Sequence, residues 1–100
     1  MQKIKNIKEL KVGDEIITFI NGIPHCCEVI AFCKDDPEVI YITDVRGHAH
    51  ELHQLCLEDG TEVWFKDYTT RSIIEYRYNY YSKMMELCKS ELYALRTINK

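Results

Sequence analysis

The sequence has no apolar run that approaches the roughly 20 residues a membrane-spanning helix needs. Its first six residues lack the apolar stretch of a signal peptide, so we expect a cytoplasmic protein. The 4 glycines are scattered singly, which excludes a glycine-rich phosphate-binding loop. No CxxC pair occurs, and a zinc ribbon or a thioredoxin-like redox site therefore has no support.

Cysteine is present 5 times, an odd count that includes the adjacent pair Cys26 and Cys27. This pattern argues against a secreted disulfide framework and favours small hydrophobic residues in a core. The chain has 100 residues, of which 46% are hydrophobic and 29% are charged. Length and composition therefore predict a single globular domain over residues 1–100.

The net charge of −3 hides an uneven distribution along the chain. Residues 1–11 carry four Lys and one Glu, which gives +3. Residues 12–67 carry twelve acids and three bases, which gives −9, and residues 68–100 carry six bases and three acids, which gives +3. The acidic middle is expected to repel phosphate, so that only the two basic ends could form a basic surface.

Short runs rich in β-branched and aromatic residues predict five strands. Asn21-Gly22 and Asp59-Gly60 are typical of two-residue hairpin turns, in which both positions need a positive φ. Because every connection is short, we expect an antiparallel meander that curls into a small barrel over residues 8–67. The predicted strands cover residues 14–20, 23–33, 39–44, 48–57 and 61–66.

The last third of the chain has helical periodicity. Apolar residues recur in steps of four and three from Ile74 to Leu95, which is a heptad stripe and predicts one long helix over residues 70–98. Ser72 and Glu75 fit a capping box, with Thr69 or Thr70 as alternative caps. The alternation of Tyr with polar residues leaves a second interpretation, in which a sixth strand runs to residue 80 and the helix begins at residue 82.

Two short motifs resemble known small barrels. Leu10-Lys11-Val12-Gly13-Asp14-Glu15-Ile16 resembles the opening of SH3-like barrels of the KOW and Tudor types. Val63-Trp64-Phe65-Lys66-Asp67-Tyr68-Thr69-Thr70, followed by a helix, is similar to small phage and mobile-element proteins that combine a barrel with a C-terminal helix. The resemblance implies an α+β fold, a five-stranded SH3-like barrel followed by one long helix. It transfers no functional residue, because one fold hosts many functions.

Two histidines suggest a zinc site. His48 and His50 lie on the same side of a predicted strand, about 7 Å apart, and Cys56 is the candidate third ligand. Surface histidines near a turn are the alternative. A thiol–imidazole pair of His25 and Cys27 is a weak candidate nucleophile, because the neighbouring Glu28 would raise the thiol pKa.

The predicted helix is too long for the predicted barrel. A helix over residues 71–97 would be about 40 Å long, whereas a barrel of this size is only about 22–25 Å across. We therefore expect a homodimer through the uncovered stripe, with a groove on another protein as the alternative and a monomer if the helix begins at residue 82. The stripe consists of Tyr81, Met85, Cys88, Leu92 and Leu95.

These features favour a non-enzymatic protein-binding module. One concrete form is a phage-type inhibitor, of the anti-CRISPR or another anti-defence kind, whose acidic barrel docks on the basic surface of a nucleic-acid-handling protein. The alternatives are a nucleic-acid-binding regulator that uses the basic termini and a zinc-binding protein. The predicted contacts, all in or beside turns, are Asp35, Asp36, Glu38, Glu58, Asp59 and Glu62.

Overall fold

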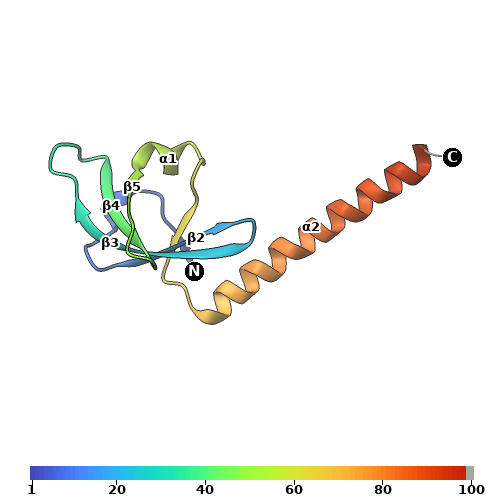
Figure 1. The fold of residues 1–100 in the computed structure, drawn as a ribbon, viewed down its shortest axis with the longest axis horizontal. Coiled ribbons are helices and arrows are strands. Elements are labelled where there is room, and N and C mark those ends of the chain that lie inside the picture. The colour runs from blue at the N-terminus through green and yellow to red at the C-terminus, as the bar shows by residue number, and fades with distance from the viewer. Residues whose placement is uncertain (99–100) are drawn as a thin grey trace.

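Six strands form one antiparallel sheet, and a single long helix projects from it (Figure 1). The computed structural model describes residues 1–98. The elements are β1 (Gln2–Lys3), the 3-10 helix η1 (Ile7–Glu9), β2 (Glu15–Ile20), β3 (Ile23–Phe32), β4 (Val39–Asp44), β5 (Ala49–His53), α1 (Gln54–Glu58), β6 (Trp64–Lys66) and α2 (Thr70–Ile98). The predicted α+β class and the long C-terminal helix are confirmed.

Strands β2 to β5 form the predicted meander, with each strand paired to the next along the chain. The β2–β3 hairpin turns at Asn21-Gly22, where φ is 54° and 79°. Both angles are positive, as a two-residue hairpin turn between right-twisted strands requires. A bulge between Val29 and Ala31 then interrupts the β3–β4 ladder, and such bulges increase the twist of a sheet.

The sheet has six strands where five were expected, and closure into a barrel is not shown among residues 1–98. The sheet is open, in the order β1-β6-β2-β3-β4-β5, with β1 and β5 at its two edges. The predicted fourth strand ends at His53, because the next five residues form α1. Asp59-Gly60 therefore follows a helix, where a glycine of positive φ is favoured, and it does not close a hairpin. The last strand, β6, returns to pair with β2 and β1.

The N-terminal segment belongs to the sheet domain, which begins earlier than the predicted residue 8. Ile4, Ile7 and Leu10 are buried in the hydrophobic core with residues from β2 to β6. Gln54, a buried polar residue, holds this segment in place: Ile7 N donates to its Oε1 (2.8 Å), and its Nε2 donates to Lys5 O (3.1 Å). Buried backbone groups need such partners, and this side chain supplies two.

Helix α2 begins with a reciprocal cap. Ser72 N donates to Thr69 Oγ1 (3.1 Å) and Thr69 N donates to Ser72 Oγ (2.7 Å). The capping box is thus one turn earlier than Ser72–Glu75, at the alternative residue Thr69. The interpretation with a sixth strand up to residue 80 is wrong, because the segment is helical from Thr70.

Candidate functional site

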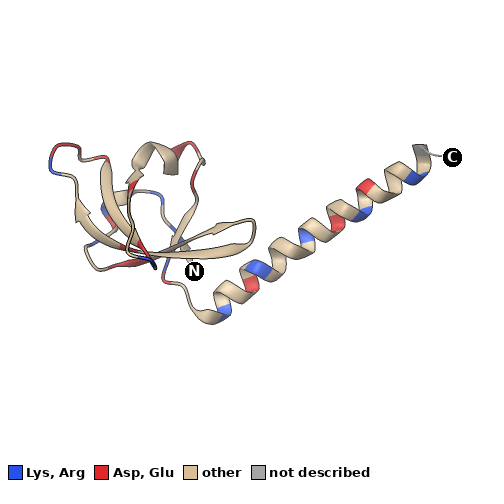
Figure 2. Cartoon of the chain, in the orientation of Figure 1, with Lys and Arg blue, Asp and Glu red and all other residues tan. Residues whose placement is uncertain are grey.

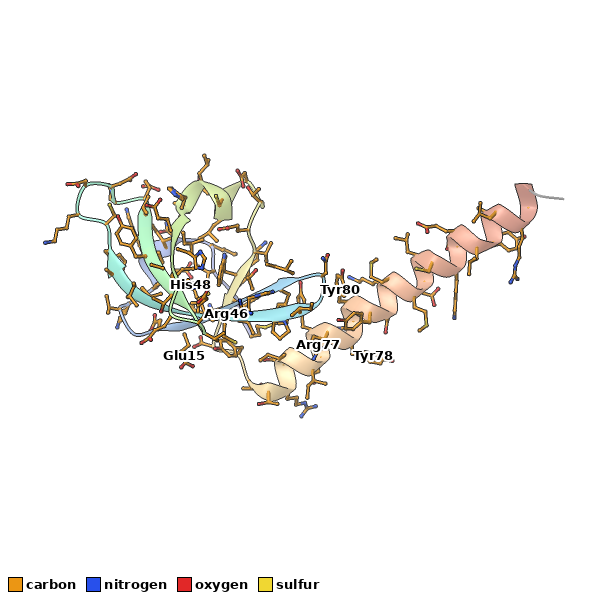
Figure 3. All side chains as sticks on the ribbon, in the orientation of Figure 1. Glu15, Arg46, His48, Arg77, Tyr78 and Tyr80 are labelled. Atoms are coloured by element: carbon orange, nitrogen blue, oxygen red, sulfur yellow. The ribbon has the colours of Figure 1, made fainter. Side chains whose placement is uncertain are left out.

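The first turns of α2 are anchored on the β2–β3 hairpin. The Tyr76 ring stacks on Phe19, with centroids 4.0 Å apart, and meets Phe65 edge-on at 5.5 Å. Arg77 Nε donates to Gly22 O (3.2 Å) at the hairpin turn. Figure 3 shows Arg77 and Tyr80 beside this hairpin. These contacts fix the direction in which α2 leaves the sheet.

Beyond Tyr81, helix α2 extends away from the sheet, and no other segment of residues 1–98 packs on it. The molecule measures 62 × 28 × 24 Å, and its long dimension includes the free helix (Figure 1). Every residue from Ser82 to Thr97 is exposed, a free length of about 24 Å at 1.5 Å per residue. Met85 and Leu92 are 61% and 55% exposed. The structure thus leaves the predicted stripe bare, and all five of its members, Tyr81, Met85, Cys88, Leu92 and Leu95, are exposed.

The free part of α2 exposes a regular apolar face. Most helical stability in proteins comes from packing of such a face, and exposed apolar patches are typical of contact sites. The stripe is therefore a candidate contact surface. Within residues 1–98, no helix combines the length and apolar character needed to cross a membrane.

The predicted acidic residues lie on both sides of α1 (Figure 2). One group is in the β3–β4 turn and is tied to α1 through Gln54 N, which donates to Glu38 O (2.8 Å). The other group follows α1, where Glu62 N donates to Cys56 O (3.1 Å). We call this set the α1 acidic surface; its members are Asp35, Asp36, Glu38, Glu58, Asp59 and Glu62, all exposed.

Some of these carboxylates also stabilise their own turns. Asp59 Oδ1 accepts from Thr61 N (2.8 Å) and from the Thr61 hydroxyl, and these bonds lower the Asp59 pKa. Asp36 Oδ1 accepts from Glu38 N (2.9 Å). The remaining three, Asp35, Glu38 and Glu62, accept no side-chain hydrogen bond from the described residues, unlike Asp36, Glu58 and Asp59.

The histidines converge on an aspartate rather than on a cysteine. His50 Nε2 lies 2.9 Å from Asp44 Oδ2, and His48 Nδ1 lies 3.9 Å from the same oxygen. Cys56 is on α1, outside this cluster. Among residues 1–98, no group of three or more His, Cys, Asp or Glu side chains is placed to hold a metal ion. The set His48, His50 and Cys56 is therefore not assembled as a zinc site.

Asp44 organises the β4–β5 turn. Its Oδ1 accepts from Arg46 N (2.9 Å) and His48 N (3.0 Å). The His50 contact, together with these backbone donors, lowers the Asp44 pKa to about 2. The carboxylate therefore stays ionised, and its main task is to hold the turn.

The pairing of His25 with Cys27 gains no support as a nucleophile. Cys27 is buried, and burial raises its pKa to about 11, with a smaller contribution from the Asp44 charge. A reactive thiol needs a lowered pKa, because the thiolate is the attacking species. Cys27 is instead part of the core, as the composition suggested.

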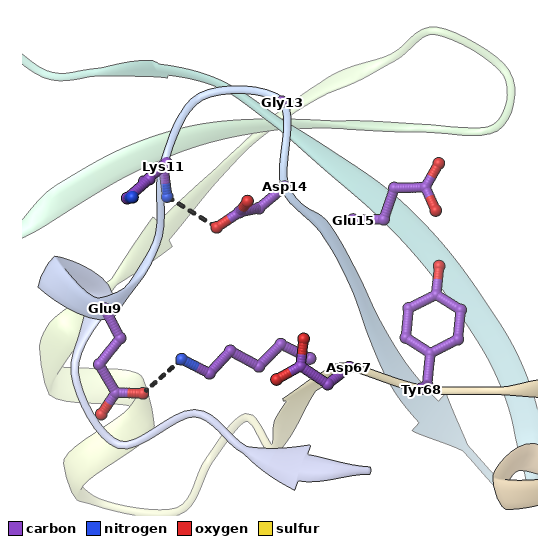
Figure 4. Close-up of a pocket in the computed structure, with 8 residues that line it drawn as sticks. Glu9, Lys11, Gly13, Asp14, Glu15, Asp67 and Tyr68 are labelled. Atoms are coloured by element: carbon purple, nitrogen blue, oxygen red, sulfur yellow. Dashed lines mark hydrogen bonds and ion pairs between the residues drawn. The ribbon is translucent and has the colours of Figure 1, made fainter.

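A hollow of about 590 Å³ lies between the N-terminal segment and the linker before α2 (Figure 4). Its polar groups largely satisfy one another: Lys66 Nζ pairs with Glu9 (3.5 Å), and Asp14 accepts from Lys11 N (2.8 Å). Burial raises the pKa of the neighbouring Tyr68 to about 12. The polar groups of this hollow therefore hold the N-terminal segment and the linker before α2 in place.

No family model matches the chain, and searches of the curated proteins and of the solved structures find no match either. The support for the apolar stripe of α2 and for the α1 acidic surface therefore comes from their geometry and charge. Sequence reasoning found the bare stripe and the acidic turns. It did not find the Tyr76 anchor or the Asp44 cluster, because both depend on residues that only the folded sheet brings together.

Proposed function

We propose that the protein is a non-enzymatic binding module. Two copies pair through the free part of α2, and each sheet domain offers its α1 acidic surface to a basic protein partner. The observation that carries the proposal is the apolar stripe of α2, whose members from Met85 to Leu95 lie on the free part of the helix, about 24 Å long. Exposed apolar surface of this extent is typical of an interaction site.

A second copy is the favoured occupant of the stripe. Its spacing is that of a coiled-coil seam, which a second identical seam covers completely. The charged residues beside the stripe also favour pairing with a second copy. Lys89 and Arg96 lie on one side of the stripe, and Glu91 lies on the other. In a parallel pair, Glu91 of one copy faces Arg96 of the other.

The α1 acidic surface suits a partner that normally binds phosphate. Its carboxylates are spaced around a short helix and exposed to solvent, so they could occupy the positions of phosphates on a nucleic-acid-handling protein. A phage-type anti-defence inhibitor remains our concrete form of this proposal. A role in nucleic-acid binding is less well supported, because basic and acidic segments alternate along the described length of α2 (Figure 2).

We also propose that the fold is a variant of the SH3-like barrel. The support is the strand order: after a four-stranded meander and a short helical turn, the last strand, β6, returns to pair with the first strand of the meander. Sheets with this connectivity curl strongly, which brings their two ends near each other.

Light scattering on the purified, reduced protein tests the pairing. We expect a dimer that Leu92→Asp converts to a monomer, since a carboxylate in the seam would be buried without a partner. Ser90→Asp is the matched control, because Ser90 is on the opposite side of the helix and receives the same charge. A monomeric wild type, or equal effects of the two variants, would refute the pairing.

The acidic surface is tested by cross-linking in a lysate of the cells that express the protein. We expect a basic protein to be captured at low salt and lost at high salt, since exposed charges are screened. Capture should also be lost when Asp35, Asp36, Glu58 and Glu62 are neutralised together as Asn or Gln. A partner that binds the neutralised variant equally well would exclude this surface.

A further inference from the structure

A cleft of about 720 Å³ is lined by residues of β2 to β6, by the segment before β6 and by Tyr76 of α2, and its lining does not include Asp35 or Asp36. Its walls come from β2 to β5 on one side and residues 61–64 on the other. Thr18 Oγ1 donates to Val63 O (2.6 Å) and ties the two walls together. This volume is within the range of sites that hold a side chain or a small ligand.

The lining of this cleft combines an apolar floor with acidic edges. Cys27, Ile42 and Trp64 line it and are all members of the hydrophobic core. Three carboxylates line it as well, those of Asp44, Glu51 and Glu62. None of the described residues that line the cleft is Lys or Arg. Asp44 meets His50 (2.9 Å) and Glu51 meets His53 (3.1 Å), whereas Glu62 forms no ion pair among the described residues.

Trp64 adds a second, independent observation. The residue is only 6% exposed, and its indole N–H is buried without any acceptor in the described part of the chain. Buried donors are normally satisfied, and an unsatisfied one typically costs about 1–3 kcal/mol. A residue that lines the cleft thus carries an unmet hydrogen-bond donor, and no Lys or Arg among the described lining residues faces the carboxylates.

We propose that this cleft takes a Lys or Arg side chain from an extended basic segment of the protein partner. Such a side chain has a long apolar stem that can lie along the Ile42 and Trp64 floor and a charged end that can meet the carboxylates. A small side-chain movement on binding would let a main-chain carbonyl of the segment reach the buried indole N–H and supply the acceptor that Trp64 lacks. The inference rests on the proposed function, since it specifies where the basic partner inserts.

The single tryptophan of the chain makes the cleft directly observable. The experiment is a fluorescence titration of the full chain with the peptide acetyl-Gly-Val-Arg-Val-Gly-amide and its Lys counterpart. Parallel titrations use the peptide with citrulline in place of Arg, which has nearly the same shape but no charge. We expect saturable changes in Trp64 emission with Arg or Lys and affinity about tenfold weaker with citrulline.

Two matched variants separate the cleft from the α1 acidic surface. Glu51→Gln removes one charge at the cleft and lies outside the α1 acidic surface, and because the residue is exposed we expect the fold to be retained. Asp35→Asn removes one charge in the β3–β4 turn, outside the cleft lining. We expect affinity for the Arg peptide to fall by about fivefold or more in the first variant and by less than about twofold in the second.

Three results would contradict the cleft proposal. Equal losses in both variants, or equal binding of the Arg and citrulline peptides, would overturn the cleft proposal. Absence of a saturable response with Arg and Lys peptides would overturn it too. None of these results would affect the pairing through α2 or capture of a partner by the α1 acidic surface, which the light-scattering and cross-linking experiments decide separately.

Discussion

The sheet domain and the free part of α2 use similar apolar residues in opposite ways. In the sheet, Leu52, Ile16 and Ile40 are fully buried, and backbone groups of distant segments pair with one another. On α2, Leu92 and Leu95 are more than half exposed, although they recur with equal regularity. Periodicity identifies the apolar face of an element, whereas the surrounding chain determines whether that face is covered.

The junction between the two regions explains the difference. Three aromatic rings, those of Phe19, Phe65 and Tyr76, hold the first turns of α2 against the hairpin. Beyond Tyr81 the helix passes the end of that hairpin and meets no further strand. The sheet domain therefore packs its own apolar residues, whereas the described residues leave those of the free helix exposed.

The largest difference in the free energy of unfolding is expected between Leu52→Ala and Leu92→Ala. Leu52 has 0% exposure in the core, and its truncation should lower the free energy of unfolding by about 2–5 kcal/mol. Leu92→Ala should change it by less than about 0.5 kcal/mol at protein concentrations where the chain is monomeric. Urea denaturation followed by Trp64 fluorescence measures both. Similar losses would mean that the chain itself covers the free helix.

A smaller difference in stability tests the junction between the sheet and α2. Tyr76→Ala removes the ring that stacks on Phe19, and we expect it to destabilise the protein by about 1–3 kcal/mol. Tyr78→Ala removes the same group from a position that is 72% exposed, and its effect should stay within about 0.5 kcal/mol. Thermal unfolding by circular dichroism compares them. An equal effect at both positions would contradict the anchoring role of Tyr76.

The hairpin turn offers a third pair, Gly22→Ala and Gly60→Ala. Both glycines have a positive φ, 79° and 76°, so both variants should lose about 1 kcal/mol to backbone strain. Only at Gly22 would the new Cβ lie 2.7 Å from the Tyr80 ring, which we expect to cost about 1 kcal/mol more. Differential scanning calorimetry measures the difference. If the two variants lose equal stability, the Tyr80 ring of α2 does not pack against the turn at Gly22.

Local patterns in the sequence were sufficient for much of this fold. Asn21-Gly22 predicted its hairpin correctly, because the conformation of a two-residue turn depends on those two residues. The heptad stripe likewise predicted α2 and its uncovered face. In both cases the signal and the structure lie in the same short segment.

Long-range pairings could not be predicted in this way. Whether Asp59-Gly60 closes a hairpin or ends a helix depends on α1, which forms where Gln54 reaches the N-terminal segment 47 residues away. The cleft likewise combines residues from β2 to β5 with the segment before β6. One local signal was available and unused: Ile4, Ile7 and Leu10 have the spacing of three that suits a 3-10 turn.

The smallest expected effect concerns the Asp44 cluster, which lies in the sheet domain and has no counterpart on α2. Asp44→Asn keeps an oxygen for the Arg46 and His48 backbone donors but loses the charge that faces His50. We therefore expect a modest loss of stability at neutral pH. Chemical denaturation from pH 7 down to pH 2 measures it, with Asp35→Asn as a control of equal charge change at an exposed turn.

The pH dependence has a defined sign. The Asp44 pKa is lowered in the folded protein from the ordinary 3.8 to about 2, so its ionised form stabilises the fold. That contribution is fully present above about pH 4 and is lost as the pH falls toward 2. The stability difference between wild type and Asp44→Asn should therefore shrink over this interval. A difference that stays constant down to pH 2 would show that the amide replaces the carboxylate at this turn without loss.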